Sequence, residues 1–433
     1  MKILVLLAGQ SKRFWPLSEK MLFPIAGKTV LEHQLGRLKK TKGDEVILVV
    51  NDQNKDAIEK SFPHHEIIVQ EDQSLGTRGA LLSALPYCGN ERVLIVCGND
   101  VVDPSVYTDL LKAADKKGID GAILGKKMDR YFPGGYLTVE KNLVTSIVEK
   151  PGEGNQPSDL VNIEIHVHND ASVLLHELQR IDNVRDDGYE QALATMFQTY
   201  RYAYLSYDGV WQPIKFPWHL LHLLPIFLKT IKKPSIHKTA EIHKTSVIEG
   251  PVVIEEGVRV LPYACIKGPA TIGKGTLIGN NALVRGSSIG KHCVIGYNTE
   301  VKDCVLADHV WTHSTYLGDS VIGENVSFGA GSVTGNLRLD EGEIHSHQLD
   351  EKIPTGLTKF GAIIGANCRL GIHSSLNPGI KIGAGSFVGS GVLVNKDLPD
   401  NTFAVMRNGD IHTRVNNSSA PHPAEREKYR KKI

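Results

Sequence analysis

The chain has 433 residues, and its 49 Lys and Arg residues nearly balance its 48 Asp and Glu residues, so the formal net charge is +1. This length predicts two or three domains with sizeable hydrophobic cores. The charge balance argues against a general nucleic-acid-binding protein, which should carry a basic excess. Hydrophobic residues make up 41% and charged residues 22%, which is typical of a globular rather than a disordered chain.

Cysteine spacing and the apolar start of the chain bear on its compartment. The six cysteines form no Cys-x-x-Cys pair, which argues against a structural zinc site. The apolar run at 3–7 ends before Gly9 and is too short for a signal peptide, and no run approaches the roughly 18 apolar residues that cross a membrane. We therefore expect a cytoplasmic protein with reduced thiols.

The first half of the chain alternates strand-like and helix-like segments. The continuous apolar runs typical of buried parallel strands lie at 3–7, 45–50, 67–69 and 93–97. The segments expected to be helical are 29–38 and 57–61. This alternation predicts right-handed crossovers and a mostly parallel sheet. We therefore expect an α/β, Rossmann-like domain over 1–230, followed by a boundary at the Lys-Lys-Pro break of 232–234.

In the second half, aliphatic residues recur every six positions and are often followed by Gly. The three frames are Ile266, Ile272, Ile278 and Val284; Ile289, Ile295 and Val301; and Leu370, Leu376, Ile382, Val388 and Val394. Helices and ordinary strands have periods of 3.6 and 2, so neither explains the pattern. A six-residue period predicts a parallel β-helix, in which each aliphatic residue points inward and stacks on its counterpart about 18 residues along. Gly and Asn are expected to turn the corners at low steric cost.

The bounds of this second domain follow from where the repeat stops. We expect the β-helix to span 234–410. Residues 333–362 interrupt the repeat, so we expect an inserted loop there. The charged tail at 411–433 is expected to form a short helix or to be disordered.

A loop of small residues follows the first expected strand. It reads Leu-Ala-Gly-Gln-Ser at 7–11 and ends at Arg13. Such a loop brings backbone N–H groups close to a nucleotide phosphate, and arginine adds a planar fork of donors. A surface turn is the alternative interpretation of the loop alone.

The run from 20 to 28, Lys-Met-Leu-Phe-Pro-Ile-Ala-Gly-Lys, makes the interpretation more specific. Together, residues 7–28 resemble the start of nucleotide-sugar pyrophosphorylases, although positions 11 and 12 read Ser and Lys where that family usually has Gly and Thr. The resemblance implies that Ala8 and Gly9 bind the nucleotide. It also implies that Arg13 and Lys20 are catalytic.

Further matches to this family follow in its order. Gln70 and the pair Gly76-Thr77 resemble the segment that binds the base in uridylyl and thymidylyl members. A glutamine amide offers both a donor and an acceptor to a pyrimidine edge. Asp100 ends an apolar strand where the family places its metal carboxylate, and a hard oxygen ligand suits Mg²⁺ shared with substrate phosphates. A turn or helix-capping aspartate is the alternative for Asp100.

The family's sugar-binding elements are also matched. Gly135 resembles a sugar-facing turn, and Glu149-Lys150-Pro resembles the family's Glu-Lys-Pro element. The resemblance implies that Glu149 accepts sugar hydroxyls and that Lys150 contacts phosphate. Asn162 matches the Val-Asn that precedes Gly-Ile-Tyr in the family, but residues 164–166 read Glu-Ile-His here.

One departure concerns the second metal carboxylate. The segment 211–218 resembles the family's Trp-x-Asp-Val-x-x-Pro-Trp, but Pro213 stands at the Asp position, and Asp208 is out of register. Proline has no side-chain ligand for a cation. Either another residue completes the site, or this half of the protein is slow or inactive.

The β-helix carries its own group of chemistry-bearing residues. The run His313-Ser-Thr-Tyr316-Leu-Gly-Asp, followed by Gly-Ala-Gly and Asn336, resembles the acetyltransferase half of bifunctional N-acetylglucosamine-1-phosphate uridylyltransferases. A sugar amine attacks a thioester only when neutral, and histidine is the natural base for its proton. The resemblance implies His313 as base, Lys302 and Tyr316 as sugar-phosphate ligands and Asn336 as an acetyl-CoA ligand. A surface histidine, a core tyrosine and a solvated lysine are the alternatives.

Residues 1–410 therefore resemble the archaeal-type bifunctional sugar-1-phosphate nucleotidylyltransferase/acetyltransferases. The resemblance implies acetyl transfer from acetyl-CoA to glucosamine 1-phosphate, then Mg²⁺-dependent uridylyl transfer from UTP to give UDP-N-acetylglucosamine. It also implies a left-handed β-helix that assembles as a homotrimer. The alternatives are a nucleotidylyltransferase with a non-catalytic β-helix, a sugar-nucleotide sensor, and an acetyltransferase whose uridylyl half is inactive.

Overall fold

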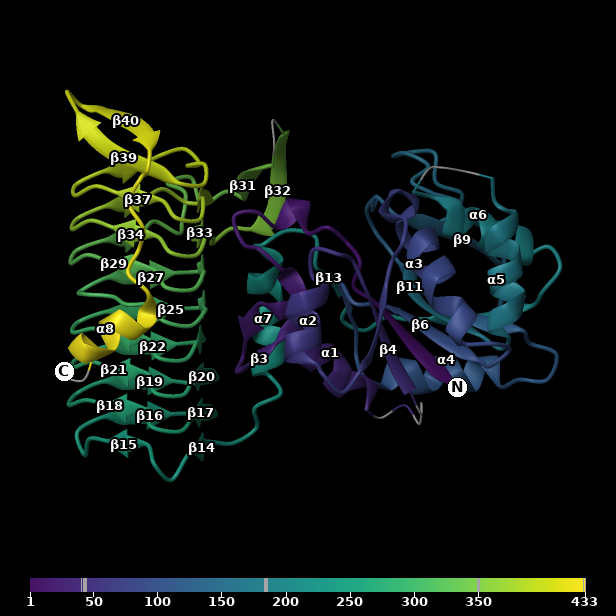
Figure 1. The fold of residues 1–433 in the computed structure, drawn as a ribbon, viewed down its shortest axis with the longest axis horizontal. Helices are drawn as coiled ribbons and strands as arrows, with labels where there is room; N and C mark the ends of the chain where they lie inside the picture. The colour runs from purple at the N-terminus through teal and green to yellow at the C-terminus, as the bar shows by residue number, and fades with distance from the viewer. Residues whose placement is uncertain (40, 42–44, 183–185, 349–350, 431, 433) are drawn as a thin grey trace. The chain divides into compact units, whose positions relative to one another are not determined.

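The apolar run after Met1 forms strand β1 (Lys2–Leu6), which lies inside a nine-stranded sheet of order β5-β4-β1-β6-β11-β8-β12-β10-β9 (Figure 1). β1 pairs in parallel with β4 (Glu45–Val50) and β6 (Val93–Cys97). Leu4 and Val5 are fully buried, as a continuous apolar run predicts for a strand covered on both faces. The expected strands at 3–7, 45–50, 67–69 and 93–97 are all confirmed.

The computed structural model describes residues 1–39, 41, 45–182, 186–348, 351–430 and 432. The chain groups into two units. The first comprises Met1–Gln10 and Leu31–Pro213, and the second comprises Ser11–Val30 and Ile214–Ile433.

The sheet of the first unit is mixed rather than mostly parallel. Its other strands are β5 (Glu66–Val69), β8 (Gly121–Lys127), β9 (Gly135–Glu140), β10 (Leu143–Glu149), β11 (Leu160–His168) and β12 (Tyr202–Ser206). β4–β5 and β8–β12 are parallel, but β11 is antiparallel to β6 and β8, and β10 is antiparallel to β9 and β12. The β9–β10 hairpin turns through Lys141 and Asn142, both at positive φ, which is the backbone that a tight hairpin requires. Short hairpins of this kind reverse the chain without a crossover helix.

Helices pack on this sheet through their apolar faces. They are α1 (Val30–Leu38), α2 (Lys55–Ser61), α3 (Gly76–Ala84), α4 (Ser105–Ala114), α5 (Ala171–Arg180) and α6 (Gly188–Met196). The expected helices at 29–38 and 57–61 are confirmed as α1 and α2. The core joins strands to helices: Ile95 and Leu137 of the sheet cluster with Leu81 of α3 and Leu174 of α5.

The second half forms a left-handed parallel β-helix with three sheets (Figure 1). The first sheet contains β14 (Ser235–Ile236), β17 (Val252–Ile254), β20 (Ala270–Ile272), β23 (Ser288–Ile289), β26 (Val305–Leu306), β28 (Val321–Ile322), β33 (Ala362–Ile364) and β36 (Ile380–Ile382). The second contains β16 (Val247–Glu249), β19 (Cys265–Lys267), β22 (Leu283–Arg285), β25 (Glu300–Lys302), β27 (Tyr316–Gly318), β30 (Val333–Thr334), β35 (Ser375–Leu376) and β38 (Leu393–Val394). The third face contains β15 (Glu241–Ile242), β18 (Arg259–Val260), β21 (Leu277–Ile278) and β24 (Val294–Ile295), and then β29 (Ser327–Phe328), β34 (Arg369–Leu370), β37 (Phe387–Val388), β39 (Thr402–Arg407) and β40 (Asp410–Val415).

The six-residue frames point inward as predicted. Every aliphatic residue of the three frames lies in one buried cluster, and none is more than 4% exposed. Ile266 stacks on Val284, and Val284 stacks on Val301, through parallel strand pairs. The sequence period therefore predicts the core of this domain residue by residue.

The expected role of the repeat glycines is wrong in part. A Cβ on Gly273 would lie 2.5 Å from the carbonyl carbon of Gly290 in the next coil, so this glycine permits close stacking rather than a corner. Other repeat glycines, such as Gly275 (φ 66°) and Gly385 (φ 69°), do have the left-handed backbone of a corner, as do Asn281 (φ 57°) and Asn298 (φ 53°). Asparagine tolerates that conformation better than most residues with a Cβ.

The interruption of the repeat is a β-hairpin rather than an irregular loop. β31 (Ile344–Gln348) pairs antiparallel with β32 (Glu351–Leu357), while 349–350 lie outside the described residues. The β-helix resumes directly, because β28 pairs with β33. The tail contains α8 (Pro423–Arg430), which confirms the expected short helix, while 431 and 433 lie outside the described residues.

Residues 11–30 belong to the second unit and pack on the β-helix. They form η1 (Lys12–Phe14), η2 (Lys20–Leu22) and the ribbon β2 (Pro24–Ile25) with β3 (Lys28–Thr29). The Ala26 N–H donates to Ser288 Oγ at 2.7 Å, and Trp15 Nε1 donates to Asp400 Oδ1 at 2.9 Å. Helix α7 (His219–Leu228) belongs to the same unit.

All six cysteines are free thiols. Among the helices of the described residues, none is both long enough and apolar enough to span a bilayer.

Candidate functional site

The loop after β1 is held by two asparagine side chains. Asn51 Nδ2 donates to the carbonyls of Ala8, at 2.9 Å, and Gly9, at 3.4 Å, while Asn54 Nδ2 donates to the carbonyl of Leu7 at 2.9 Å. With these carbonyls engaged, the loop's N–H groups are the polar atoms it can offer to a phosphate. Asn51 and Asn54 are positioning residues that the loop motif alone does not reveal.

Gln70, Gly76 and Thr77 lie together as predicted. Gln70 is 3% exposed, and its Nε2 donates to the carbonyls of Asp72 at 2.7 Å and Gly76 at 3.0 Å. Both amide hydrogens are thus engaged within the protein, so we expect the Gln70 carbonyl oxygen to be the group that accepts from a base. Gly79 makes room for this amide, because a Cβ there would lie 2.6 Å from Gln70 Nε2.

The predicted metal residue Asp100 lies directly opposite Pro213. β7 (Asp100–Val101) pairs antiparallel with β13 (Gln212–Pro213), with Asp100 and Pro213 in register. Asp100 is 7% exposed, and its Oδ1 accepts from Trp211 Nε1 at 2.8 Å. The motif therefore has the expected register, and proline occupies the position of the family's second carboxylate.

A second carboxylate reaches Asp100 from β11. Ligand atoms of Cys97, Asp100 and Glu164 all lie within 4.8 Å of one another. Burial, followed by the charge of Asp100, raises the pKa of Glu164 to about 7. Carboxylate oxygens are hard donors, so Asp100 and Glu164 fit a divalent cation such as Mg²⁺, whereas the Cys97 sulfur is a soft donor.

Glu164 is a candidate ligand that the family motifs do not identify, because residues 164–166 depart from the family triplet. The signal in the sequence is an acidic residue between two aliphatic residues of β11, Ile163 and Ile165, which are fully buried. Such a residue is seldom buried unless it has a partner or a ligand.

The predicted sugar residues Gly135 and Glu149 are cross-strand partners. β9 pairs with β10 in a register that sets Gly135 opposite Glu149, and a Cβ on Gly135 would lie 3.2 Å from Glu149 Oε2. Lys150 Nζ forms an ion pair with Glu149 Oε1 at 2.8 Å. Burial lowers the pKa of Lys150, but the bond to Glu149 and nearby acidic groups outweigh it, so the net pKa is raised and the side chain stays cationic.

Asn162 is held by a buried chain of histidines and tyrosines. Its Oδ1 lies 2.8 Å from His166 Nε2, and His166 Nδ1 lies 2.6 Å from Tyr189 Oη. Burial lowers the pKa of His166 to about 3, so the ring is neutral. An amide oxygen only accepts, so His166 Nε2 donates to Asn162 and Nδ1 accepts from Tyr189. His166 is therefore a positioning residue rather than a sugar ligand.

The chain of hydrogen bonds continues away from the site. Tyr189 Oη lies 3.2 Å from His168 Nε2, and His168 Nδ1 lies 2.7 Å from Tyr202 Oη. With each ring neutral, the direction of donation is the same throughout, from Tyr202 to His168, Tyr189, His166 and Asn162. The Asn162 amide NH₂ is then left to face other partners.

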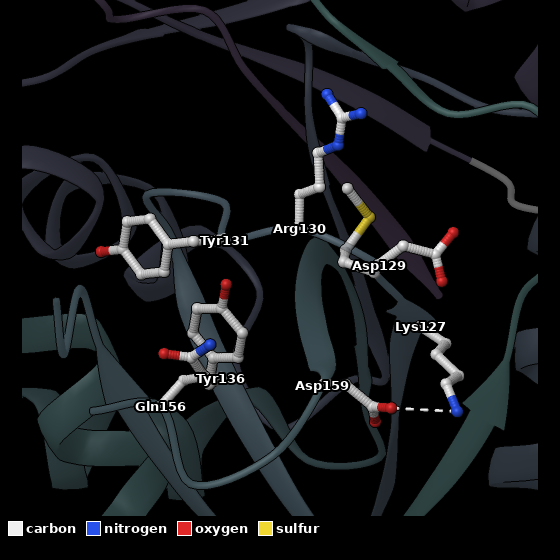
Figure 2. A pocket seen from close by; sticks show the side chains of 8 residues that line it. Lys127, Asp129, Arg130, Tyr131, Tyr136, Gln156 and Asp159 are labelled. Atoms are coloured by element: carbon white, nitrogen blue, oxygen red, sulfur yellow. Dashed lines mark ion pairs between the residues drawn. The ribbon is translucent and has the colours of Figure 1, made fainter. Parts of the chain in front are cut away.

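Figure 2 shows a pocket of about 310 Å³ in the same unit. Tyr131 and Tyr136 stack in its wall with ring centroids 5.9 Å apart, and Lys127 pairs with Asp159 at 3.0 Å. None of the predicted site residues lines this pocket. We therefore assign it no part in the reaction.

Arg13 and Lys20 belong to the second unit. The Arg13 guanidinium lies over the Phe216 ring at 5.8 Å from its centroid. Lys20 is 9% exposed at the start of η2. Their predicted catalytic roles rest on the sequence motif.

Two of the four predicted acetyltransferase residues, Lys302 and Asn336, bind Asp319, and a third, Tyr316, bonds to Asn336. Asn336 Nδ2 donates to Asp319 Oδ2 at 2.5 Å and to Tyr316 Oη at 3.2 Å, and Lys302 Nζ pairs with Asp319 Oδ2 at 2.9 Å. Burial lowers the pKa of Lys302, but bonds to Asp303 and Asp319 outweigh it, so the net pKa is raised. Asp319 is in the quoted motif but was given no role, and the structure makes it the centre of the cluster.

Arg285 lies one coil from this cluster. It is in register with Lys302 on adjacent strands and forms an ion pair with Glu300 at 2.7 Å. The signal for this register in the sequence is the interval of one coil between two cationic residues on the same face.

His313 is exposed just before β27, and Thr315 Oγ1 binds its backbone N–H and carbonyl. Within the described part of the chain, its imidazole has no hydrogen bond or ion pair. The ring is therefore open to a ligand or to another chain.

Known families match consecutive parts of the chain. Residues 2–214 match the family described as Nucleotidyl transferase, 230–327 match the GMPPB C-terminal domain, and 361–396 match the Bacterial transferase hexapeptide (six repeats). These matches confirm the expected pairing of a nucleotidyltransferase domain with hexapeptide repeats.

Relatives are similar over almost the whole chain. The bifunctional sugar-1-phosphate nucleotidylyltransferase/acetyltransferase of Sulfurisphaera tokodaii is 31% identical over 411 residues, which cover 92% of this chain and 98% of that protein. The bifunctional protein GlmU of Methanococcus vannielii is 30% identical over 434 residues, which cover 93% of this chain and 97% of that protein.

Proposed function

This chain belongs to the family of bifunctional sugar-1-phosphate nucleotidylyltransferase/acetyltransferases, and on that premise we propose that it makes UDP-N-acetylglucosamine by two successive transfers. The first moves an acetyl group from acetyl-CoA to the amine of glucosamine 1-phosphate. The second moves a uridylyl group from UTP to N-acetylglucosamine 1-phosphate and releases pyrophosphate. We do not favour the alternative of a non-catalytic sensor, because both halves match enzyme families.

The acetyl transfer is assigned to the β-helix. His313 takes a proton from the sugar ammonium group, the neutral amine attacks the thioester carbonyl, and coenzyme A leaves as its thiol. Lys302 and Tyr316 bind the sugar phosphate, and Asn336 binds acetyl-CoA. The open His313 imidazole supports a site completed by a neighbouring chain, so we include a homotrimer in the proposal.

The uridylyl transfer is assigned to the first half. A phosphate oxygen of the sugar 1-phosphate attacks the α-phosphorus of UTP, and catalysis depends mainly on positioning and charge neutralisation. Gln70, Gly76 and Thr77 orient the base, while Glu149 and Asn162 hold the sugar. Mg²⁺ bound at Asp100 would supply neutralisation of the phosphate charge. Arg13 and Lys20 are assigned to the phosphates, and the cytoplasm is the proposed compartment.

The observation that carries the bifunctional proposal is that the predicted base- and sugar-binding residues lie in the first unit, whereas the predicted acetyltransferase residues lie in the second, which also contains Arg13 and Lys20. Glu149 and Gly135 pair within the first unit, whereas Lys302, Tyr316 and Asn336 gather around Asp319 in the second. Each set contains the charged and polar groups that its own substrates require.

The test is one reaction containing glucosamine 1-phosphate, acetyl-CoA, UTP and Mg²⁺, in which coenzyme A and pyrophosphate are followed separately. Release of both supports the proposal. Pro213 favours one competing outcome, an acetyltransferase without uridylyl transfer, which predicts coenzyme A release without pyrophosphate. Release of neither product, together with no pyrophosphate from a parallel reaction that contains N-acetylglucosamine 1-phosphate and UTP, would refute both transfers.

A further inference from the structure

Pro213 leaves a gap in the metal site of the first unit. It lies opposite Asp100 in the β7–β13 pair, where the family motif has a second aspartate. Because the strand register is retained, Pro213 replaces the aspartate at the ligand position itself, and the segment is not shifted along its partner strand. A divalent cation bound by one carboxylate alone would be held weakly.

The structure places another carboxylate near Asp100. Glu164 lies on β11, where the pairing with β8 shifts register between Ile163 and His166, so that Glu164 and Ile165 form a bulge. Bulges next to active sites re-aim side chains. The Glu164 carboxylate lies with the ligand atoms of Asp100 and Cys97 inside a 4.8 Å group.

We propose that Glu164 and Asp100 together hold the divalent cation of the uridylyl reaction, so that Glu164 replaces the carboxylate lost at Pro213. This inference rests on the proposed function for the identity of the reaction. The proposed second ligand lies on β11, whereas the family motif has its second aspartate in the segment that forms β13 here.

The surroundings of Glu164 support a ligand role. Thr77 Oγ1 donates to its Oε1 at 3.3 Å, and the Cys97 thiol also bonds to it, so the carboxylate is oriented by two neighbours. Neither neighbour carries a positive charge that would neutralise Glu164. A cation bound by both Glu164 and Asp100 would relieve the repulsion between the two carboxylates.

Another acidic side chain, that of Glu190, lies close enough to Glu164 to interact with it electrostatically. Glu190 on α6 is 8% exposed, and within the described residues no other side chain hydrogen-bonds its carboxylate. It interacts electrostatically with Glu164 and Glu149, and Lys150 is the cation that acts on it. Burial raises the pKa of Glu190 well above its usual range, and Lys150 is also the ion-pair partner of Glu149.

The test is Mn²⁺ binding to the full-length protein, measured by electron paramagnetic resonance of the free ion and independent of turnover. Glu164→Gln removes the charge while keeping the side-chain shape. We expect its Mn²⁺ dissociation constant to rise at least about tenfold, in the range seen when groups that support a bound metal are changed. An unchanged dissociation constant in a folded variant would overturn the proposal.

Two further variants separate ligation from general charge. Glu190→Gln removes a neighbouring negative charge that supplies no atom to the ligand group, and we expect a change below about threefold; a loss equal to that of Glu164→Gln would overturn the proposal. Glu164→Gln combined with Pro213→Asp returns a carboxylate opposite Asp100, and we expect Mn²⁺ affinity to recover. A double variant that melts like the wild type but binds Mn²⁺ as weakly as the single variant would count against the inference.

Failure of the proposed function gives a different result. A wild-type protein that binds Mn²⁺ through Glu164 but releases no pyrophosphate would refute uridylyl transfer and leave the metal assignment standing. A wild type that releases pyrophosphate, together with a Glu164→Gln variant of normal Mn²⁺ affinity, would refute only the metal assignment.

Discussion

The hydroxyl of Tyr189 joins two buried histidines to the amide of Asn162, for which we propose a role in sugar binding, and its removal is a sharp test of that arrangement. Tyr189→Phe keeps the ring, which is 1% exposed, and deletes the oxygen that lies 2.6 Å from His166 Nδ1 and 3.2 Å from His168 Nε2. Each neutral buried hydrogen bond contributes about 1 kcal/mol, and the stranded ring nitrogens add a desolvation cost, so we expect a loss of at least about 2 kcal/mol.

The same variant should affect sugar binding. Without Tyr189, His166 no longer has a fixed tautomer, so the orientation of Asn162 is no longer imposed by its partner. We expect KM for N-acetylglucosamine 1-phosphate to rise by several-fold, with a smaller change in kcat. Urea unfolding followed by circular dichroism and a pyrophosphate-release assay measure the two effects.

Tyr107→Phe is the matched control. Tyr107 is fully buried in the same unit, but within the described residues its hydroxyl has no hydrogen-bond partner. Removing an unsatisfied buried hydroxyl should leave stability unchanged or raise it by about 1 kcal/mol. If Tyr189→Phe and Tyr107→Phe unfold at the same urea concentration and KM is unchanged in both, the proposed hydrogen-bond chain is wrong.

Three further predictions concern other parts of the molecule. His313→Ala should lower the rate of coenzyme A release at least about 100-fold, as expected for loss of a general base, while pyrophosphate release from UTP and N-acetylglucosamine 1-phosphate stays unchanged; equal loss of both products would contradict the assignment. Gly273→Ala should lower the thermal unfolding temperature, because its Cβ would lie 2.5 Å from the Gly290 carbonyl carbon. Gly36→Ala in α1 is its control, with open space around the new methyl group and a gain of about 0.5–1 kcal/mol expected from helix propensity. Burial lowers the pKa of His166 from 6.5 to about 3, so the folded protein keeps this ring neutral where the unfolded chain would protonate it. The contribution of His166 to stability is therefore complete above pH 6.5 and is lost as the pH falls toward 3. Replacing His166 by Gln should flatten that part of the curve of unfolding free energy against pH, and an unchanged curve would refute a buried neutral ring.

The interior of the β-helix was predictable because its period is a local property of the chain. Each coil repeats the same step, so a residue such as Ile272 is inward wherever its frame continues, and it is fully buried. The first strands of the α/β sheet were predictable for a similar reason. A strand such as β4 that is covered on both faces needs no polar residues on an exposed face, so its sequence is a continuous apolar run. The antiparallel placement of β9, β10 and β11 was not, because strand direction depends on partners that are distant in sequence.

The candidate site residues can also be divided into those that were predictable from the sequence and those that were not. The family, the aliphatic core and most candidate site residues could be predicted, because the motifs and the six-residue period are local features of the chain. The contacts of Glu164 with Asp100, of His166 with Asn162, and of Asp319 with Lys302 and Asn336 became visible in the folded protein. Glu164 and Asp100 lie on strands whose separation along the chain carries no period, whereas Lys302, Asp319 and Asn336 follow one another at intervals of one coil, 17 residues. In both cases a buried polar group is specified by the partner that folding brings to it.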